Sequence, residues 1–307
     1  MNVSIVVPVY NSEQSLLELA NRIDGVLSRA GGAFEMVLVN DGSHDQSWQQ
    51  VQQLASTYPW VVGIDLMRNY GQHNALLCGI RAASNEVIVT LDDDLQNPPE
   101  EIPRLIERLN EGYDVVYGVP RSQQHGLWRD MASYITKLTL QGAMGAETAT
   151  RVSAFRAFRR DVRGAFSDFR GPYVSLDVLL TWATTSFGSV VVEHQPRQAG
   201  RSNYTFSKLL VHSLNMMTGF STLPLQLASM IGFASTIFGV VMLLFVLGRY
   251  LMEGGVVPGF AFLASAIAIF SGAQLFAIGI FGEYLARMHF RVMDRPAYAV
   301  RTVIGGN

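Results

Sequence analysis

The 307-residue sequence contains a single cysteine, Cys78, which excludes an internal disulfide. A chain without disulfides fits a reducing compartment. Features of nucleic-acid binding are also missing, because the net charge is −2 and no basic stripe carries interleaved aromatic residues. The first residues lack the basic start and the cleavable apolar segment of a secretory signal peptide. We therefore expect the soluble part of the chain to remain in the cytosol.

Charged residues are absent from two long stretches towards the C-terminus. Hydrophobic residues make up 49% of the chain and charged residues 16%, and no Asp, Glu, Lys or Arg lies between Lys208 and Arg249 or from Gly254 to Gly282. A hydrocarbon core about 30 Å thick needs roughly 20 apolar residues as helix, so each stretch can cross a bilayer. We expect spans near Leu225 to Tyr250 and Val257 to Leu285. Buried core helices are the alternative, which two such segments in succession disfavour.

Arginines are unevenly distributed around these spans. The loop between them offers only Arg249 and Glu253, whereas four arginines follow the second span: Arg287, Arg291, Arg295 and Arg301. Because basic residues favour the cytoplasmic side, this bias predicts that both termini are cytoplasmic.

Several common kinds of site are missing. The sequence has no G-x-G-x-x-G and no Walker-type glycine loop, the six histidines show no metal-ligand spacing, and no Ser/His/Asp or Cys/His nucleophile arrangement is supported. If a nucleotide binds, its phosphates must be neutralised by a metal ion and by arginines.

Three consecutive aspartates form the strongest candidate site. The apolar, β-branched run Val87 to Leu91 predicts a buried strand, and it ends in Asp92, Asp93 and Asp94. On an extended backbone Asp92 and Asp94 share one face and Asp93 faces away. With Gln96, these two carboxylates make an oxygen-ligand set for Mg²⁺ or Mn²⁺, which substrate phosphates often complete. An acidic loop or a helix cap is the alternative for the triplet alone.

Strands and helices alternate in the first part of the chain, which predicts a mainly parallel α/β sheet covered on both faces. The expected strands are residues 3–9, 34–39, 61–66 and 87–91, and the helices include 47–58 and 73–83. Ligands of such sheets lie beyond the carboxyl ends of the strands. Polar pairs follow each of these ends, so we expect a site at this rim: Tyr10-Asn11, Asn40-Asp41, Arg68-Asn69 and Asp92 to Asp94.

The second part of the chain is expected to contain a strand at Val115 to Gly118, helices at residues 127–140 and 174–184, and a strand at 190–193. A loop with Arg197, Arg201, Ser202 and Tyr204 follows. Guanidinium groups bind phosphate bidentately, which favours an anion site there; a solvated surface is the alternative for any single arginine. Residues 206–220 predict an amphipathic helix lying on the membrane.

These motifs, in their order, resemble the polyprenyl-phosphate branch of the family 2 GT-A glycosyltransferases, which includes bactoprenol glucosyltransferases, an aminoarabinose transferase and dolichyl-phosphate mannose synthase. The matching motifs are Val7 to Asn11, Val39 to Asp45, Arg68 to Gln72, Leu91 to Glu100 and Gly200 to Tyr204. The resemblance implies a Rossmann-like GT-A domain over residues 1–205 and an interfacial helix over 206–222. Residues 223–307 would form two transmembrane helices and a cytosolic tail.

The resemblance also implies roles for individual residues. Those that would bind the nucleotide donor are Pro8, Tyr10, Asp41, Asn69, Gln72 and Arg121. Those that would hold the divalent metal are Asp92, Asp94 and Gln96. Arg129 and Ser133 match the positions that bind the acceptor phosphate, and Arg197, Ser202 and Tyr204 would close over the site. The residues expected to carry catalysis are Asp92, Asp94, Arg129 and Arg197.

The implied reaction is inverting, metal-dependent transfer of a sugar, first of all glucose from UDP-glucose, onto undecaprenyl phosphate at the cytosolic leaflet of a bacterial inner membrane. An aminoarabinose derivative, GDP-mannose or a UDP-amino sugar is the alternative donor. A phosphate monoester has a second pKa near 6 and is largely a dianion in the cytosol, so we expect no essential catalytic base. A shared membrane anchor suggests a homo-oligomer.

Three positions depart from the family pattern. Ser12 stands where many relatives have Glu, Asn203 replaces a lysine, and no acidic residue occurs in Ala149 to Val152. A processive polysaccharide synthase is disfavoured because the Q-x-x-R-W motif is absent. A transferase acting on hydroxyl groups would need a positioned base that the sequence does not reveal. A catalytically silent nucleotide-sugar-binding membrane protein is the alternative from another class, and the intact acidic cluster argues against it.

Overall fold

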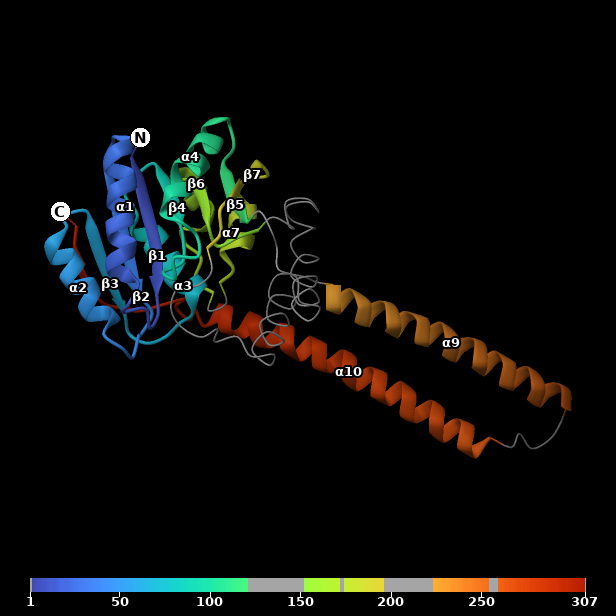
Figure 1. Ribbon diagram of the computed structural model, residues 1–307. Coiled ribbons are helices and arrows are strands. Elements are labelled where there is room, and N and C mark those ends of the chain that lie inside the picture. Colours follow the sequence, from blue (N-terminus) through green and yellow to red (C-terminus); the bar gives the residue numbers. More distant parts are fainter. Residues whose placement is uncertain (1, 121–151, 172–173, 196–222, 254–258, 307) are drawn as a thin grey trace. The chain divides into compact units, whose positions relative to one another are not determined.

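The computed structural model describes residues 2–120, 152–171, 174–195, 223–253 and 259–306 (Figure 1). The chain divides into two units, one of Met1–Ser213 together with Asp294–Asn307 and the other of Leu214–Met293. The helices expected over residues 127–140 and 206–220 lie outside the described residues.

The first unit contains an eight-stranded sheet with the strand order β7-β5-β6-β4-β1-β2-β3-β8. Its strands are β1 (Val3–Val9), β2 (Phe34–Asn40), β3 (Val61–Leu66), β4 (Val87–Thr90), β5 (Val115–Pro120), β6 (Arg156–Arg159), β7 (Phe187–Val192) and β8 (Val300–Gly305). β1 pairs in parallel with β2 and β4, β2 with β3, and β5 with β7, whereas β6 and β8 run antiparallel to their neighbours. The predicted mainly parallel sheet is confirmed; β6 and β8 were not among the predicted strands.

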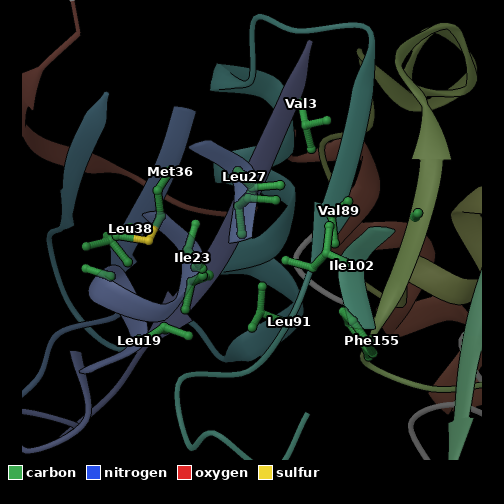
Figure 2. Packing of buried hydrophobic residues seen from close by; sticks show 14 of the residues in the cluster. Val3, Leu19, Ile23, Leu27, Met36, Leu38, Val89, Leu91, Ile102 and Phe155 are labelled. Carbon is green, nitrogen blue, oxygen red and sulfur yellow. The ribbon is translucent and has the colours of Figure 1, made fainter. Parts of the chain in front are cut away.

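Helices cover both faces of the sheet. On one face, α1 (Leu16–Ala30), α2 (Ser47–Thr57) and α4 (Ile102–Asn110) contribute to one buried cluster, and Figure 2 shows Leu19 and Ile23 of α1 beside Leu38 of β2. On the other face lies α3 (Gln72–Ala82), where a Cβ on Gly79 would come within 2.4 Å of Val6. Only glycine permits this close approach of helix and sheet. All seven residues of β1 are buried, as expected of a central strand covered on both faces.

Two short helical segments and one further helix complete the described part of the sheet domain. These are η1 (Pro99–Glu101), η2 (Arg160–Phe166) and α7 (Leu176–Ala183). A hydrogen bond from the backbone N–H of Leu176 to Nδ1 of His73 joins the first turns of α7 and α3 (3.3 Å). α7 therefore begins beside the end of α3 that is nearest to the carboxyl ends of the strands.

The second unit consists of two long helices, α9 (Leu223–Glu253) and α10 (Phe260–Val292), which pack against each other. The segments Pro224–Arg249 and Ile269–Ala286 are long and apolar enough to cross a membrane, by length and composition. The two expected spans fall on these helices.

The residues after α10 rejoin the first unit. Residues 294–307, which were expected to form a cytosolic tail, belong to the unit that holds the sheet. There β8 pairs antiparallel with β3 and forms the edge of the sheet. This strand is short and its partner is far away in the sequence, so no local pattern indicated the pairing.

Candidate active site

The polar residues predicted at the rim follow four neighbouring strands. β4, β1, β2 and β3 lie side by side and parallel, and the segments that begin at Leu91, Tyr10, Asp41 and Met67 leave their carboxyl ends. Parallel strands present these ends at one edge of the sheet. The structure thus brings the candidate donor and metal residues of these segments together.

Asp41 is the most enclosed of these residues, with 3% of its surface exposed. Its two carboxylate oxygens accept hydrogen bonds from the backbone N–H groups of Tyr70 (2.7 Å) and Gly71 (2.8 Å). Burial raises the pKa of Asp41, and these two N–H groups oppose that rise. Next to it, Gly42 has a φ of +67°, and a Cβ there would lie 2.6 Å from the backbone nitrogen of Asn69. The loops after β2 and β3 are therefore in direct contact.

The acidic triplet lies in a turn rather than on a strand. β4 ends at Thr90, and Leu95 has a φ of +60°, which is costly for a branched side chain. The expectation that an extended backbone sets the faces of Asp92 and Asp94 is therefore wrong. The turn is closed locally by a hydrogen bond from the backbone N–H of Gln96 to Oδ1 of Asp94 (3.1 Å).

Asp93 ties this turn to the loop that follows β1. Its Oδ2 accepts a hydrogen bond from the backbone N–H of Tyr10 (3.2 Å). Burial raises the pKa of Asp93 to about 6, and hydrogen bonds from Ser12 and Tyr10 partly offset the rise. Asp93 was not among the predicted site residues, and the structure gives it the task of holding two rim loops together.

A second hydrogen bond connects the donor residues with the metal residues. Nε2 of Gln72, the first residue of α3, donates to Oδ1 of Asp92 (2.6 Å). Gln72 and Asn69 are exposed, and Tyr10 is 38% exposed with its ring edge-on to His44. Pro8 is buried within β1, opposite Val39 of β2. Its side chain is therefore part of the packed sheet and is not exposed at the rim.

The oxygen ligands offered by Asp92, Asp94 and Gln96 at the acidic turn fit a divalent cation. Two carboxylates within three residues, with an amide two residues later, offer the oxygen ligands that Mg²⁺ and Mn²⁺ prefer, and fewer than a closed cage would need. In the part of the chain that the structure describes, no cluster of three or more His, Cys, Asp or Glu side chains could hold a metal. Asp92, Asp94 and Gln96 alone would need substrate to complete the coordination of such an ion.

Six of the predicted site residues lie in segments that the structure does not describe. They are Arg121, Arg129, Ser133, Arg197, Ser202 and Tyr204. Their assignment to the donor site, the acceptor phosphate and the closing loop remains a prediction.

A buried ion pair that no sequence pattern predicted supports the strand that leads to the acidic turn. Arg156 on β6 is 2% exposed and forms a hydrogen-bonded ion pair with Asp177 at the start of α7, whose Oδ1 also accepts the hydroxyl of Tyr117 (3.1 Å). β6 is joined to β4 by the backbone pairing of Arg156 with Thr90, and the Thr90 hydroxyl donates to the carbonyl of Ala154 (2.8 Å). The cluster thus supports the last residue of β4, two residues before Asp92. No spacing rule reveals partners 21 residues apart.

Comparison with known proteins places the rim residues on β1 to β4 and their loops within a family domain. The sequence profile described as "Glycosyl transferase family 2" matches residues 4–165. An undecaprenyl-phosphate 4-deoxy-4-formamido-L-arabinose transferase of Pseudomonas aeruginosa is 37% identical over 305 residues, which cover 98% of this chain and 90% of the relative. The enzyme of that name from Pectobacterium atrosepticum is 35% identical over 306 residues, covering 99% and 94%.

Solved structures show the same fold. Glucosyl-3-phosphoglycerate synthase from Mycobacterium tuberculosis, in complex with Mn²⁺, uridine diphosphate and glucosyl-3-phosphoglycerate, has a TM-score of 0.52 and 18% sequence identity, covering 71% of this chain and 77% of that one. Its complex with Mn²⁺, uridine diphosphate and phosphoglyceric acid has a TM-score of 0.53. At this level of identity the likeness concerns the fold alone.

Proposed function

Because this chain belongs to glycosyltransferase family 2 and is an enzyme of its GT-A fold, we propose that it transfers a sugar from a nucleotide diphosphate to undecaprenyl phosphate. The observation that carries the proposal is the similarity to undecaprenyl-phosphate sugar transferases over nearly the whole chain, including both long apolar helices. The 305 aligned residues take in both the sheet domain and the apolar helices of this chain, so the support for the acceptor class is not confined to the donor-binding motifs.

The sugar that the proposal favours is a 4-deoxy-4-formamido-L-arabinose rather than glucose. All eight relatives compared at 35–37% identity carry that sugar in their names. They support the alternative donor more strongly than the UDP-glucose expected first. UDP remains the proposed carrier on the basis of the family resemblance.

On the donor side, the rim residues would bind and orient the nucleotide sugar. Asp41 is held in a fixed position by two backbone amides and would contact the nucleoside from there, and Tyr10 is exposed at the same rim. Asp92 and Asp94, with Gln96, would hold Mg²⁺ or Mn²⁺, which when bound offsets the charge of the diphosphate leaving group. Gln72 would fix the orientation of Asp92 through their hydrogen bond.

On the acceptor side, the chemistry requires positioning more than proton transfer. The phosphate of the lipid is largely a dianion at cytosolic pH and can attack without a general base. The buried carboxylate of Asp177 is not needed as a general base in this reaction, and it is already bound by Arg156 and Tyr117. Arg129 and Ser133 would bind the acceptor phosphate and align it with the sugar, and Arg197 would close over the site.

The apolar helices would keep the active site at the bilayer surface. Removing a polyprenyl chain from the bilayer costs about 0.8 kcal/mol for each CH₂ group, so the enzyme must work where the lipid lies. In this proposal both termini face the cytoplasm of a bacterial inner membrane, and a homo-oligomer would share the anchor.

The test is a transfer assay with the purified full-length protein in detergent, undecaprenyl phosphate, Mn²⁺ or Mg²⁺, and a panel of labelled nucleotide sugars. The panel contains UDP-4-deoxy-4-formamido-L-arabinose, UDP-glucose, GDP-mannose and a UDP-amino sugar. We expect a lipid-linked product that requires metal and is formed fastest from the formamido-arabinose donor. Nucleotide binding without a product from any donor would instead support a silent binding protein. Faster transfer of glucose would refute the proposed donor while retaining the reaction.

A further inference from the structure

We propose that Arg301 on β8 is a positioning residue for the donor nucleotide and acts through the loop of residues 67–71. The inference rests on the proposed function, because it takes Asp41 as part of the donor site. β8 lies in the C-terminal strap, defined as residues 294–306, which follows both apolar helices in the sequence and returns to the sheet.

A bulge in β8 directs the Arg301 side chain. Asp65 of β3 pairs with Thr302 and Leu66 pairs with Val300, so Arg301 has no residue opposite it. Such bulges commonly turn a side chain out of the regular alternation. Here the guanidinium bridges the end of β3: Nη1 donates to Oδ2 of Asp65 (3.2 Å) and Nη2 donates to the carbonyl oxygen of Met67 (2.9 Å).

Two routes lead from these contacts to Asp41. The first passes through Asp65, whose Oδ1 accepts a hydrogen bond from the Nδ2 group of Asn40 (2.7 Å), the residue directly before Asp41. The second passes through Met67, whose backbone N–H donates to the carbonyl of Ala299 in the strap (2.9 Å). Both backbone polar groups of Met67 are therefore bound by the strap.

The loop held in this way is the one that holds Asp41. Met67 starts the segment whose amides at Tyr70 and Gly71 donate to the two oxygens of Asp41. Asp65 is 3% exposed, so its carboxylate depends on Asn40 and Arg301 for compensation. The Arg301 side chain is 57% exposed, so replacing it removes these contacts without opening a cavity in the core.

The strap also carries a separate reporter of its docking. Cys78 on α3 is 4% exposed, and Tyr298 of the strap opposes the effect of burial on the pKa of its thiol. The Tyr298 hydroxyl accepts a hydrogen bond from Arg81 of the same helix (3.4 Å). Burial raises the pKa of this thiol to about 12. Because Cys78 is the only cysteine of the chain, slow alkylation shows that the strap is in place.

The experiment compares the full-length wild-type protein with Arg301→Gln, Arg301→Lys and the control Arg170→Gln. The control removes a different ion pair of the strap, between Arg170 and Asp294, which is exposed and involves no rim residue. Calorimetric titration with UDP and Mn²⁺ gives nucleotide affinity, and steady-state assays give kcat and the KM of each substrate. Hydrogen exchange at residues 67–71 gives the stability of the loop.

For Arg301→Gln we expect UDP affinity to fall about five- to tenfold, because a hydrogen bond from an exposed guanidinium contributes about as much as one ordinary hydrogen bond. The KM for the nucleotide sugar should rise by the same factor, while kcat and the KM for undecaprenyl phosphate stay within about twofold. Exchange at Tyr70 and Gly71 should quicken. Arg301→Lys should recover part of the affinity, because an ammonium can keep the contact with Asp65, and Arg170→Gln should match the wild type.

Three results would overturn the inference. The first is unchanged exchange at residues 67–71 in Arg301→Gln, and the second is unchanged UDP affinity despite faster exchange. The third is rapid alkylation of Cys78 in Arg301→Gln, which would show that the strap has detached and that Arg301 has a merely structural role. A wild-type protein that binds no nucleotide would refute the proposed function instead, while the exchange comparison would still show whether Arg301 holds the loop.

Discussion

Aspartates occupy two different environments in the sheet domain. At the rim, Asp41 and Asp93 accept hydrogen bonds from backbone N–H groups, and Asp92 accepts one from the neutral amide of Gln72. In the interior, Asp177 is bound by the guanidinium of Arg156. A hydrogen bond from a neutral donor orients a carboxylate without itself cancelling the negative charge, whereas an ion pair with an arginine does cancel it. We infer that the rim charges serve binding and the interior charge serves the fold.

The structural role of the interior ion pair is tested most directly by removing its cation, Arg156. Arg156→Met should lower stability by about 3–5 kcal/mol, because it leaves the buried carboxylate of Asp177 without its counter-charge. Thermal denaturation of the detergent-solubilised protein measures the effect. The double variant Arg156→Met/Asp177→Leu should regain most of the loss, because an apolar pair can fill the same space. A double variant less stable than Arg156→Met would contradict the assignment.

The next largest effect is expected at the rim, on activity rather than on stability. Asp92→Asn and Asp94→Asn should each lower kcat/KM about a hundred- to a thousandfold, which is typical for loss of one group that stabilises developing charge. Their melting temperatures should stay close to that of the wild type. Asp93→Asn is the matched control: it removes the same charge from the adjacent residue but can still accept the Tyr10 amide, so activity should stay within about tenfold. Equal losses in all three variants would mean that only net charge matters.

The smallest effect is expected for an ion pair that belongs to neither class. Arg22 on α1 donates to both carboxylate oxygens of Glu100 (2.9 and 2.6 Å) at the surface. Arg22→Gln should cost less than about 1 kcal/mol, since solvent screens exposed pairs. The hydrogen bond from Arg22 lowers the pKa of Glu100 below its ordinary value of 4.5. The contribution is thus present above that value and is lost as the pH falls through the folded pKa. Melting curves of both proteins at pH 7 should differ slightly and should converge under acid; a gap that widens under acid would contradict this sign.

The rim could be predicted from the sequence because each strand and the polar residues after it are recognised from a short stretch of sequence. Runs of β-branched residues such as Val3 to Val9 identify the central strands, and the polar residues after each run must then meet at one edge of a parallel sheet. The two apolar helices could also be predicted from the sequence, since their length and lack of charge suffice to identify them.

What could not be predicted depends on contacts that are distant in the sequence or on unusual backbone. The pair of Arg156 with Asp177 joins two segments with no common pattern. Asp93 and Asp94 lie in a turn after β4, where strand periodicity suggested an extended backbone, and Leu95 directly after them has a positive φ. The pairing of β8 with β3 joins residues more than two hundred positions apart, as in the bond between Arg301 and Asp65. Physical principles explain each of these contacts in the structure, but they do not predict from the sequence which residues will pair.

The place of β8 in the chain has a consequence for biosynthesis. A ribosome releases β1 to β7 first, then both apolar helices, and only afterwards the strand that completes the sheet beside β3. Until then the edge of β3 offers unpaired backbone groups to any passing strand. The sheet is therefore finished only after both apolar helices have been made, so the sheet domain reaches its final form only when almost the whole chain has left the ribosome.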